Sequence, residues 1–77
     1  MLELYYMQSC PYCKKVVDYF DDNDIDYTLK DVYNSENYER LMKLGGEAQV
    51  PFLVDTDNLR HMYESDEIIN YVSKLAN

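Results

Sequence analysis

The stretch Cys10-Pro11-Tyr12-Cys13 directly follows the first apolar run of the chain, at residues 2–7. The apolar run predicts a strand, and a helical pattern begins at the cysteines. Pro11 falls near the first helical position, where the N–H that a proline lacks would have no partner in any case. Cys10 falls at the N-cap, where free backbone N–H groups and the helix dipole favour a thiolate. The spacing therefore predicts a redox pair, with Cys10 exposed and nucleophilic and Cys13 more buried and resolving.

The composition limits the classes of function. The 77 residues predict one domain, residues 1–77, and the net charge of −8 makes nucleic acid and anionic membranes poor partners. The chain has no run of 18 apolar residues and no basic segment ahead of an apolar one at its start, so we expect a soluble, cytoplasmic protein. Two cysteines are too few for a disulfide scaffold, and a Cys-x-x-Cys beside a strand–helix pattern in a cytosolic chain indicates redox chemistry.

Helical and strand patterns alternate along the rest of the chain. The sequence predicts strands at residues 2–7, 25–32, 49–54 and 59–63, with a turn at residues 55–58. It predicts helices at residues 13–23, between an Asn34 or Ser35 cap and Gly45-Gly46, and after a Ser65 cap. The order β-α-β-α-β-β-α predicts an α/β fold, with a four-stranded mixed sheet and three helices covering both faces.

Zinc binding is the alternative explanation for the two cysteines. Two thiolates need two further ligands, and His61 is the only histidine of the chain. A zinc site within one chain would be incomplete, although two chains could complete one between them. We expect no metal.

The element order, the Cys-Pro-Tyr-Cys motif and Val50-Pro51 at the third strand together resemble the glutaredoxins. The resemblance implies the thioredoxin-like fold, and the reduction of protein disulfides and glutathione mixed disulfides with glutathione as electron donor. It implies that Tyr12 flanks bound glutathione and that Val50 pairs its backbone with the cysteinyl part. Pro51 is expected in the cis form, and Gln49 stands where the family usually has threonine. The resemblance places both residues beside Val50 in the glutathione site.

The segment that opens the last helix carries the other end of the expected glutathione site. In the glutaredoxin resemblance Ser65 and Asp66 hold the γ-glutamyl group, and a helix N-terminus does offer N–H groups to a carboxylate. Residues 51–54 and 63–69 are also similar to the N-terminal domain of glutathione transferases. That second resemblance implies a contact between Glu64 and the γ-glutamyl group, so both point to glutathione as co-substrate.

Cationic residues near the site differ from the glutaredoxin pattern. Many glutaredoxins have a lysine three residues before the first cysteine, where this chain has Met7. The resemblance then leaves Arg40 or Lys43 to meet the glycine carboxylate of glutathione. Lys14 and Lys15, directly after the motif, are expected to support the thiolate.

The sequence leaves three functions open. The first is a monomeric dithiol glutaredoxin that serves electron transport and cell redox homeostasis, acting on disulfide-bonded or glutathionylated proteins. The second is a glutaredoxin-like electron donor that thioredoxin reductase reduces and that serves, for example, ribonucleotide reductase. The third is a non-enzymatic module that binds glutathione or an iron–sulfur cluster.

Overall fold

The structure is a computed structural model that describes residues 1–75. Its elements are β1 (Leu2–Tyr6), α1 (Pro11–Asp22), β2 (Thr28–Asp31), α2 (Ser35–Gly45), β3 (Phe52–Asp55), β4 (Arg60–Tyr63) and α3 (Ser65–Leu75). The strands form one sheet in the order β2-β1-β3-β4. β2 runs parallel to β1, and β3 and β4 each run antiparallel to the neighbour that precedes them in this order. The predicted element order and mixed sheet are confirmed.

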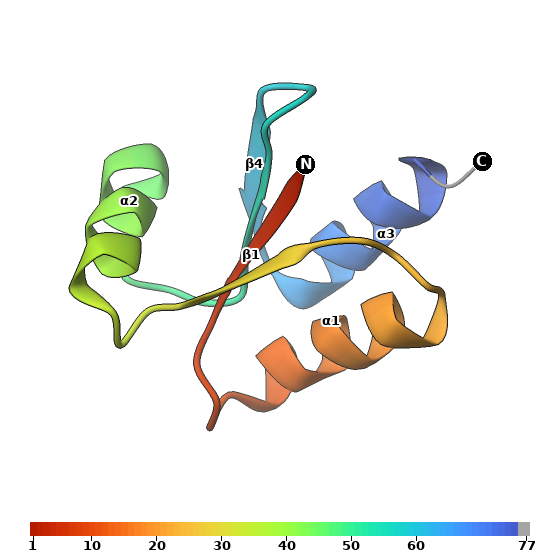
Figure 1. Cartoon of the computed structure of the whole chain (residues 1–77), viewed down its shortest axis with the longest axis horizontal. Helices are drawn as coiled ribbons and strands as arrows, with labels where there is room; N and C mark the ends of the chain where they lie inside the picture. Colours follow the sequence, from red (N-terminus) through yellow and green to blue (C-terminus); the bar gives the residue numbers. More distant parts are fainter. Residues whose placement is uncertain (76–77) are drawn as a thin grey trace.

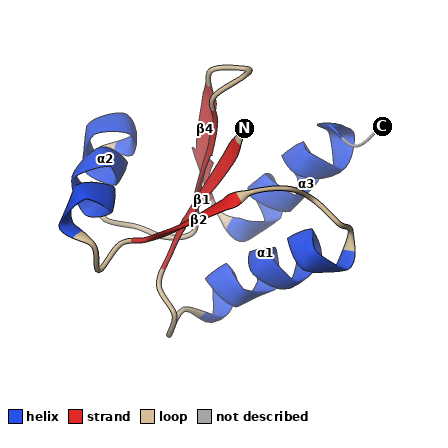
Figure 2. Cartoon of the chain, viewed as in Figure 1, coloured by secondary structure: helices blue, strands red, loops and turns tan. Residues whose placement is uncertain are grey.

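Helices cover both faces of the sheet. Figure 1 shows α1 and α3 together on one side and α2 on the other, and Figure 2 shows the sheet between them. Because successive strand residues point to opposite faces, neighbouring Leu4 and Tyr5 of β1 enter two different cores. The core under α1 and α3 contains Leu4, Val16, Phe20, Leu53, Ile68 and Val72. The core under α2 contains Tyr5, Leu41, Phe52 and Val54.

The ends of α2 follow from its predicted caps. Asn34 is the N-cap, and its side-chain oxygen accepts hydrogen bonds from the N–H groups of Glu36 and Asn37, at 2.9 and 3.2 Å. Gly46 ends the helix with a left-handed φ of 82°, and its N–H donates to the Met42 carbonyl. A glycine adopts this φ without steric cost.

Two strands begin three residues later than their sequence patterns predict. β2 begins only at Thr28, because Ile25 still donates its N–H to Phe20 O at the end of α1, while its side chain packs against the core. β3 begins at Phe52 and not at Gln49, because Pro51 has no N–H to donate to a sheet ladder. Val50-Pro51 is a cis peptide bond, as expected.

The predicted N-cap of the last helix is wrong by one residue. Ser65 is the first residue of α3, and the carbonyl of Glu64 accepts the hydrogen bond from Ile68 N–H that opens the helix. Glu64 therefore has the cap position, with a φ of 73°, and Ser65 is buried inside the first turn.

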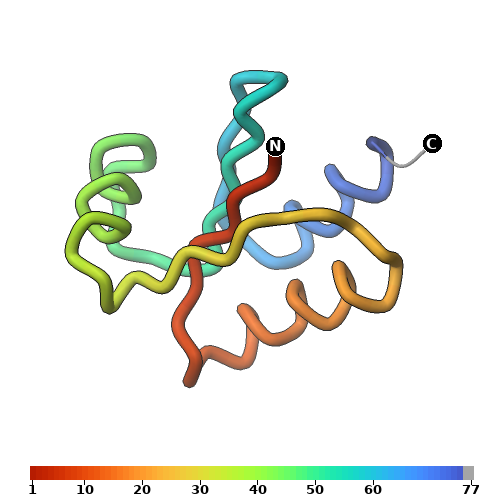
Figure 3. Tube along the Cα trace, in the orientation of Figure 1, coloured from red at the N-terminus to blue at the C-terminus, as the bar shows by residue number. Residues whose placement is uncertain are grey.

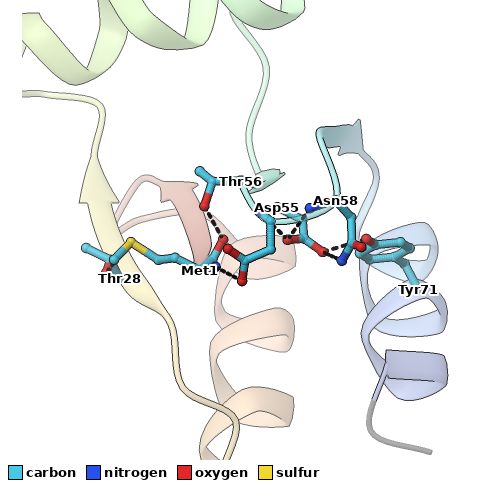
Figure 4. A network of polar contacts seen from close by, with 7 residues as sticks. Met1, Thr28, Asp55, Thr56, Asn58 and Tyr71 are labelled. Atoms are coloured by element: carbon cyan, nitrogen blue, oxygen red, sulfur yellow. Dashed lines mark hydrogen bonds and ion pairs between the residues drawn. The ribbon is translucent and has the colours of Figure 1, made fainter.

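A polar network ties the β3–β4 turn to the chain start and to α3. Asp55, only 2% exposed, accepts hydrogen bonds from Asn58 Nδ2 at 2.7 Å and from the Tyr71 hydroxyl at 2.6 Å (Figure 4). Burial acts to raise the pKa of Asp55, but these hydrogen bonds outweigh burial and hold the pKa below its ordinary value. Thr56 donates its N–H to Met1 O, so the hairpin turn lies beside the first residue (Figure 3). Asp55 also accepts from the backbone of Asp57 and Asn58, which confirms the predicted turn.

Across residues 1–75, the helices are all too short or too polar to cross a bilayer.

Candidate active site

The Cys10 side chain lies at the N-terminus of α1. Cys10 is the N-cap, Pro11 is the first helical residue, and the Cys10 Sγ accepts a hydrogen bond from Cys13 N–H at 3.2 Å. The same sulfur lies 4.0 Å from the Val50 carbonyl oxygen, to which the thiol can donate. The N–H donor and the positive helix end stabilise negative charge on this sulfur. Cys10 is half-buried and can be reached by a substrate, in agreement with its expected position.

Cys13 lies one helical turn further along α1, with its side chain fully buried. Burial is the largest cause that raises the pKa of the Cys13 thiol to about 12, and the hydrogen bond with Cys10 adds to the effect. The two thiols therefore differ as the sequence predicts, because Cys10 meets solvent and Cys13 is kept neutral inside the protein.

A cavity of about 420 Å³ lies beside the Cys-Pro-Tyr-Cys motif. Its wall combines the start of α1, the loop after α2 and the start of α3. The residues that line it are Tyr12, Gln49, Val50, Pro51, Glu64, Ser65 and Asp66. These are all seven residues that the family resemblances assigned to a glutathione site, drawn from three separate parts of the sequence.

Two carboxylates at this cavity are already engaged by neighbouring side chains. Gln49 Nε2 donates to Glu64 Oε1 at 3.2 Å, which links the loop to the cap of α3. Lys15 Nζ lies 2.6 Å from Asp66 Oδ1, which links α1 to α3 across the rim. Both side chains of the second pair are exposed, so water screens their attraction.

The two lysines after the motif each pair with a carboxylate. Lys14 pairs with Asp18 one turn along α1, at 2.8 Å, and Lys15 pairs with Asp66, so neither ammonium is placed on the Cys10 sulfur by these contacts. Sequence reasoning missed the Lys15–Asp66 pair, since nothing in the sequence relates residues 51 positions apart.

Neither proposed partner for the glycine carboxylate lines the cavity. Arg40 instead places Nε 3.3 Å from Glu3 Oε1 and lines a second cavity, between α2 and the β3–β4 hairpin. His61 lines that second cavity too, away from the cysteines. Within residues 1–75, no three His, Cys, Asp or Glu side chains gather as they would around a metal ion.

The arrangement suits thiol–disulfide exchange. An accessible sulfur at a helix N-terminus can attack a disulfide, and a second thiol lies one turn away to form an internal disulfide. The cavity beside it offers backbone groups near Val50, helix N–H groups at Ser65 and carboxylates at Glu64 and Asp66. Those groups can hold a ligand that carries a carboxylate and an ammonium group.

Comparisons with known proteins agree with this geometry. Residues 4–77 match the family described as glutathione S-transferase, N-terminal domain. Glutaredoxin 2 of Escherichia coli strain K12 is 36% identical over 74 residues, covering 96% of this chain and 34% of the relative. The chain thus spans about a third of the length of the curated relatives that it matches.

The solved structures that resemble this chain also include glutaredoxin 2 and glutathione transferases. The crystal structure of glutaredoxin 2 from Salmonella typhimurium in complex with glutathione superposes with a TM-score of 0.84 at 27% identity, over 100% of this chain and 34% of that one. Human glutathione-S-transferase T1-1 superposes with a TM-score of 0.82 at 25% identity, over 99% of this chain and 32% of that one. The chain therefore has the thioredoxin-like fold and belongs to the family of glutathione S-transferase N-terminal domains.

Proposed function

We propose that this domain is a glutathione-dependent thiol–disulfide oxidoreductase of the glutaredoxin type, with Cys10 as its nucleophile. The observation that carries the proposal is the position of the Cys10 sulfur. It is half-exposed at a helix N-terminus and opens beside a cavity lined by Val50, Ser65 and Asp66. The glutathione complex of the Salmonella glutaredoxin 2 supports glutathione as the ligand of this cavity.

The first step is attack of the Cys10 thiolate on a protein–glutathione mixed disulfide. The thiolate attacks the glutathione sulfur, a new Cys10–glutathione disulfide forms, and the protein thiol leaves as thiolate and takes a proton from solvent. The substrate protein gains two electrons and the domain is oxidised. The γ-glutamyl end is held at Ser65 and Asp66, and Asp66 exchanges its Lys15 partner for the ligand ammonium.

The second step returns Cys10 to the thiolate. A second glutathione thiolate attacks the glutathione sulfur of the adduct, glutathione disulfide leaves, and Cys10 is released. On a protein disulfide, the Cys10 thiolate attacks one substrate sulfur, and the other substrate sulfur leaves as a thiolate. Cys13 then loses its proton and attacks the Cys10 sulfur, so the bond between Cys10 and the substrate breaks and the substrate leaves with both thiols reduced. Two glutathione molecules then reduce the internal disulfide and leave as glutathione disulfide. Only the second route requires Cys13.

The identity of the electron donor distinguishes the proposed function from that of a glutaredoxin-like protein that thioredoxin reductase reduces. Met7 stands where the resemblance expects a lysine, and its backbone carbonyl accepts a hydrogen bond from Cys10 N–H at 3.1 Å. A weaker glutathione site would favour reduction by thioredoxin reductase and a role as electron donor, for example to ribonucleotide reductase. We still propose glutathione as the electron donor, because the cavity offers groups that can bind both the carboxylate and the ammonium group of the γ-glutamyl end.

The proposal also includes the location, the oligomeric state and the substrates of the protein. Two cysteines are too few for a disulfide scaffold, and the net charge is −8, which supports a cytoplasmic protein. We propose a monomer with disulfide-bonded or glutathionylated proteins as substrates and electron transport in redox homeostasis as its role. A glutathione- or cluster-binding module without turnover is the remaining alternative, and the absorbance spectrum of the purified protein distinguishes a cluster.

The test is turnover of a glutathione mixed disulfide under two electron supplies. We expect turnover with glutathione and glutathione reductase, and its loss in the Cys10→Ser variant. Turnover with thioredoxin reductase alone would contradict the proposed donor, and an active Cys10→Ser protein would contradict the proposed nucleophile.

A further inference from the structure

The loop that carries Val50 is held near its start, at Glu47, by one hydroxyl group of the sheet. Tyr63 is the last residue of β4, and its hydroxyl makes two hydrogen bonds with the backbone of Glu47. It accepts from Glu47 N–H at 3.1 Å and donates to Glu47 C=O at 2.8 Å. The ring packs on Phe52, with 4.6 Å between centroids, so the position of the hydroxyl is fixed by the core.

Val50 packs against the core under α2 and Pro51 is buried, but residues 46–49 are exposed and have few other attachments. Residues 46–51 lie between α2 and β3 and form no strand pairing. Gln49 donates its N–H back to Glu47 O, and its side chain donates to Glu64 at 3.2 Å across an exposed surface. A segment with few buried contacts depends strongly on each hydrogen bond that fixes it. Tyr63 therefore fixes the exposed part of the loop, residues 46–49, which leads into this wall of the cavity.

The end of α2 is shaped around the same hydroxyl. A Cβ on Gly45 would lie 2.0 Å from the Tyr63 Oη and 2.7 Å from its Cζ. Gly45 lies within α2 and does not have a positive φ, so the structure needs a glycine here for space and not for backbone freedom. The phenol cannot easily move away, because Phe52 holds its ring.

We propose that Tyr63 is a positioning residue of the glutathione cavity. By holding Glu47, its hydroxyl sets the distance between Val50 and the Cys10 sulfur, and so it controls binding of the glutathione part of a substrate. The proposal rests on the proposed function, since it concerns the same cavity. Tyr63 does not line that cavity and touches no reacting atom.

The test replaces Tyr63 by phenylalanine, which keeps the ring on Phe52 and removes only the hydroxyl. We expect the KM for a glutathione mixed disulfide to rise about three- to tenfold, the size expected from one or two lost neutral hydrogen bonds. We expect kcat within about twofold, because the end of α1 and the Cys13 N–H group that donates to the Cys10 sulfur are unchanged. The alkylation rate of Cys10 by iodoacetamide, which does not use the cavity, should also stay unchanged.

Tyr71→Phe is the matched control. It removes a hydroxyl that donates to Asp55 at 2.6 Å, on the hairpin turn and away from the cavity. It should lower the free energy of unfolding and leave KM unchanged. If Tyr63→Phe left KM unchanged, or lowered only kcat, the positioning role would be refuted.

Hydrogen exchange separates this inference from the proposed function. The Glu47 amide should exchange faster in Tyr63→Phe than in wild type and in Tyr71→Phe, whether or not the domain turns over glutathione. An unchanged exchange rate would refute the role of Tyr63. Faster exchange in a protein without turnover would support the loop attachment and refute only the glutathione function.

Discussion

Replacing Cys13 by serine should leave turnover of a glutathione mixed disulfide within about twofold of the wild-type rate, because glutathione and not Cys13 resolves the Cys10 adduct. The structure supplies the reason. Cys13 is fully buried, and burial first, then the hydrogen bond with Cys10, raise its pKa from 9.0 to about 12. Burial, the larger cause, does not depend on the state of Cys10.

The pKa of the Cys13 thiol explains why its replacement should have a small effect on turnover. At pH 7 a thiol with a pKa of about 12 is a thiolate in roughly one molecule in 10⁵, about a thousandfold less often than a thiol with a pKa of 9. A glutathione thiol in solvent, with an ordinary pKa near 8.5, has far more of the attacking form. The low thiolate fraction of Cys13 is the reason that we expect its loss to change this turnover little.

The assay compares wild type, Cys13→Ser and Cys10→Ser on one glutathionylated peptide, with glutathione reductase to report glutathione disulfide. Cys10→Ser should lose all turnover. A Cys13→Ser variant that lost more than about tenfold in rate would refute the reasoning, since it would show that the buried thiol ionises readily. On a protein disulfide without glutathionylation, the same variant should lose turnover, because the internal disulfide cannot form.

Three further predictions follow from the contacts of single residues. Asp55→Asn should lower the free energy of unfolding by about 1–3 kcal/mol in urea titrations. Since folding lowers the pKa of Asp55, its contribution is present above the unfolded value near pH 4 and is lost as the pH falls through the folded pKa, so the two proteins should converge in acid. Lys15→Gln should lower the KM for glutathione mixed disulfides up to about fivefold at low salt by freeing Asp66, and kinetics at about 0.5 M salt should show no difference. Gly45→Ala should raise KM as Tyr63→Phe does and also lower the melting temperature, because its Cβ would meet the phenol.

Features that depend on neighbouring residues were predictable from the sequence. The Cys10 cap, the Asn34 cap and the Gly46 helix end each involve side chains or φ angles within one turn. The alternating patterns gave the element order, because each strand and helix must bury one face. The seven cavity residues followed from family resemblance, and the fold brings them together.

Features that depend on distant residues or on the geometry of element ends were not predictable. The Lys15–Asp66 pair joins two helices, and no local pattern shows which lysine a carboxylate meets. Tyr63 is one of nine tyrosines, and only the fold places its hydroxyl on Glu47. The cap of α3 was placed one residue too late, because a serine before an acidic pair has the composition of a cap even when it is the first helical residue.

The glutathione adduct itself tests the central claim most directly. Cys13→Ser protein would be incubated with glutathione disulfide, quenched with acid, digested and examined by mass spectrometry. The account predicts one glutathionyl group, on Cys10, whose rate of formation saturates as the concentration of glutathione disulfide rises. Replacing the cavity residue Asp66 by alanine should raise the concentration that saturation requires. The account would be contradicted if Cys13→Ser formed no adduct, or if the rate rose without saturation both in Cys13→Ser and in the Cys13→Ser, Asp66→Ala double variant.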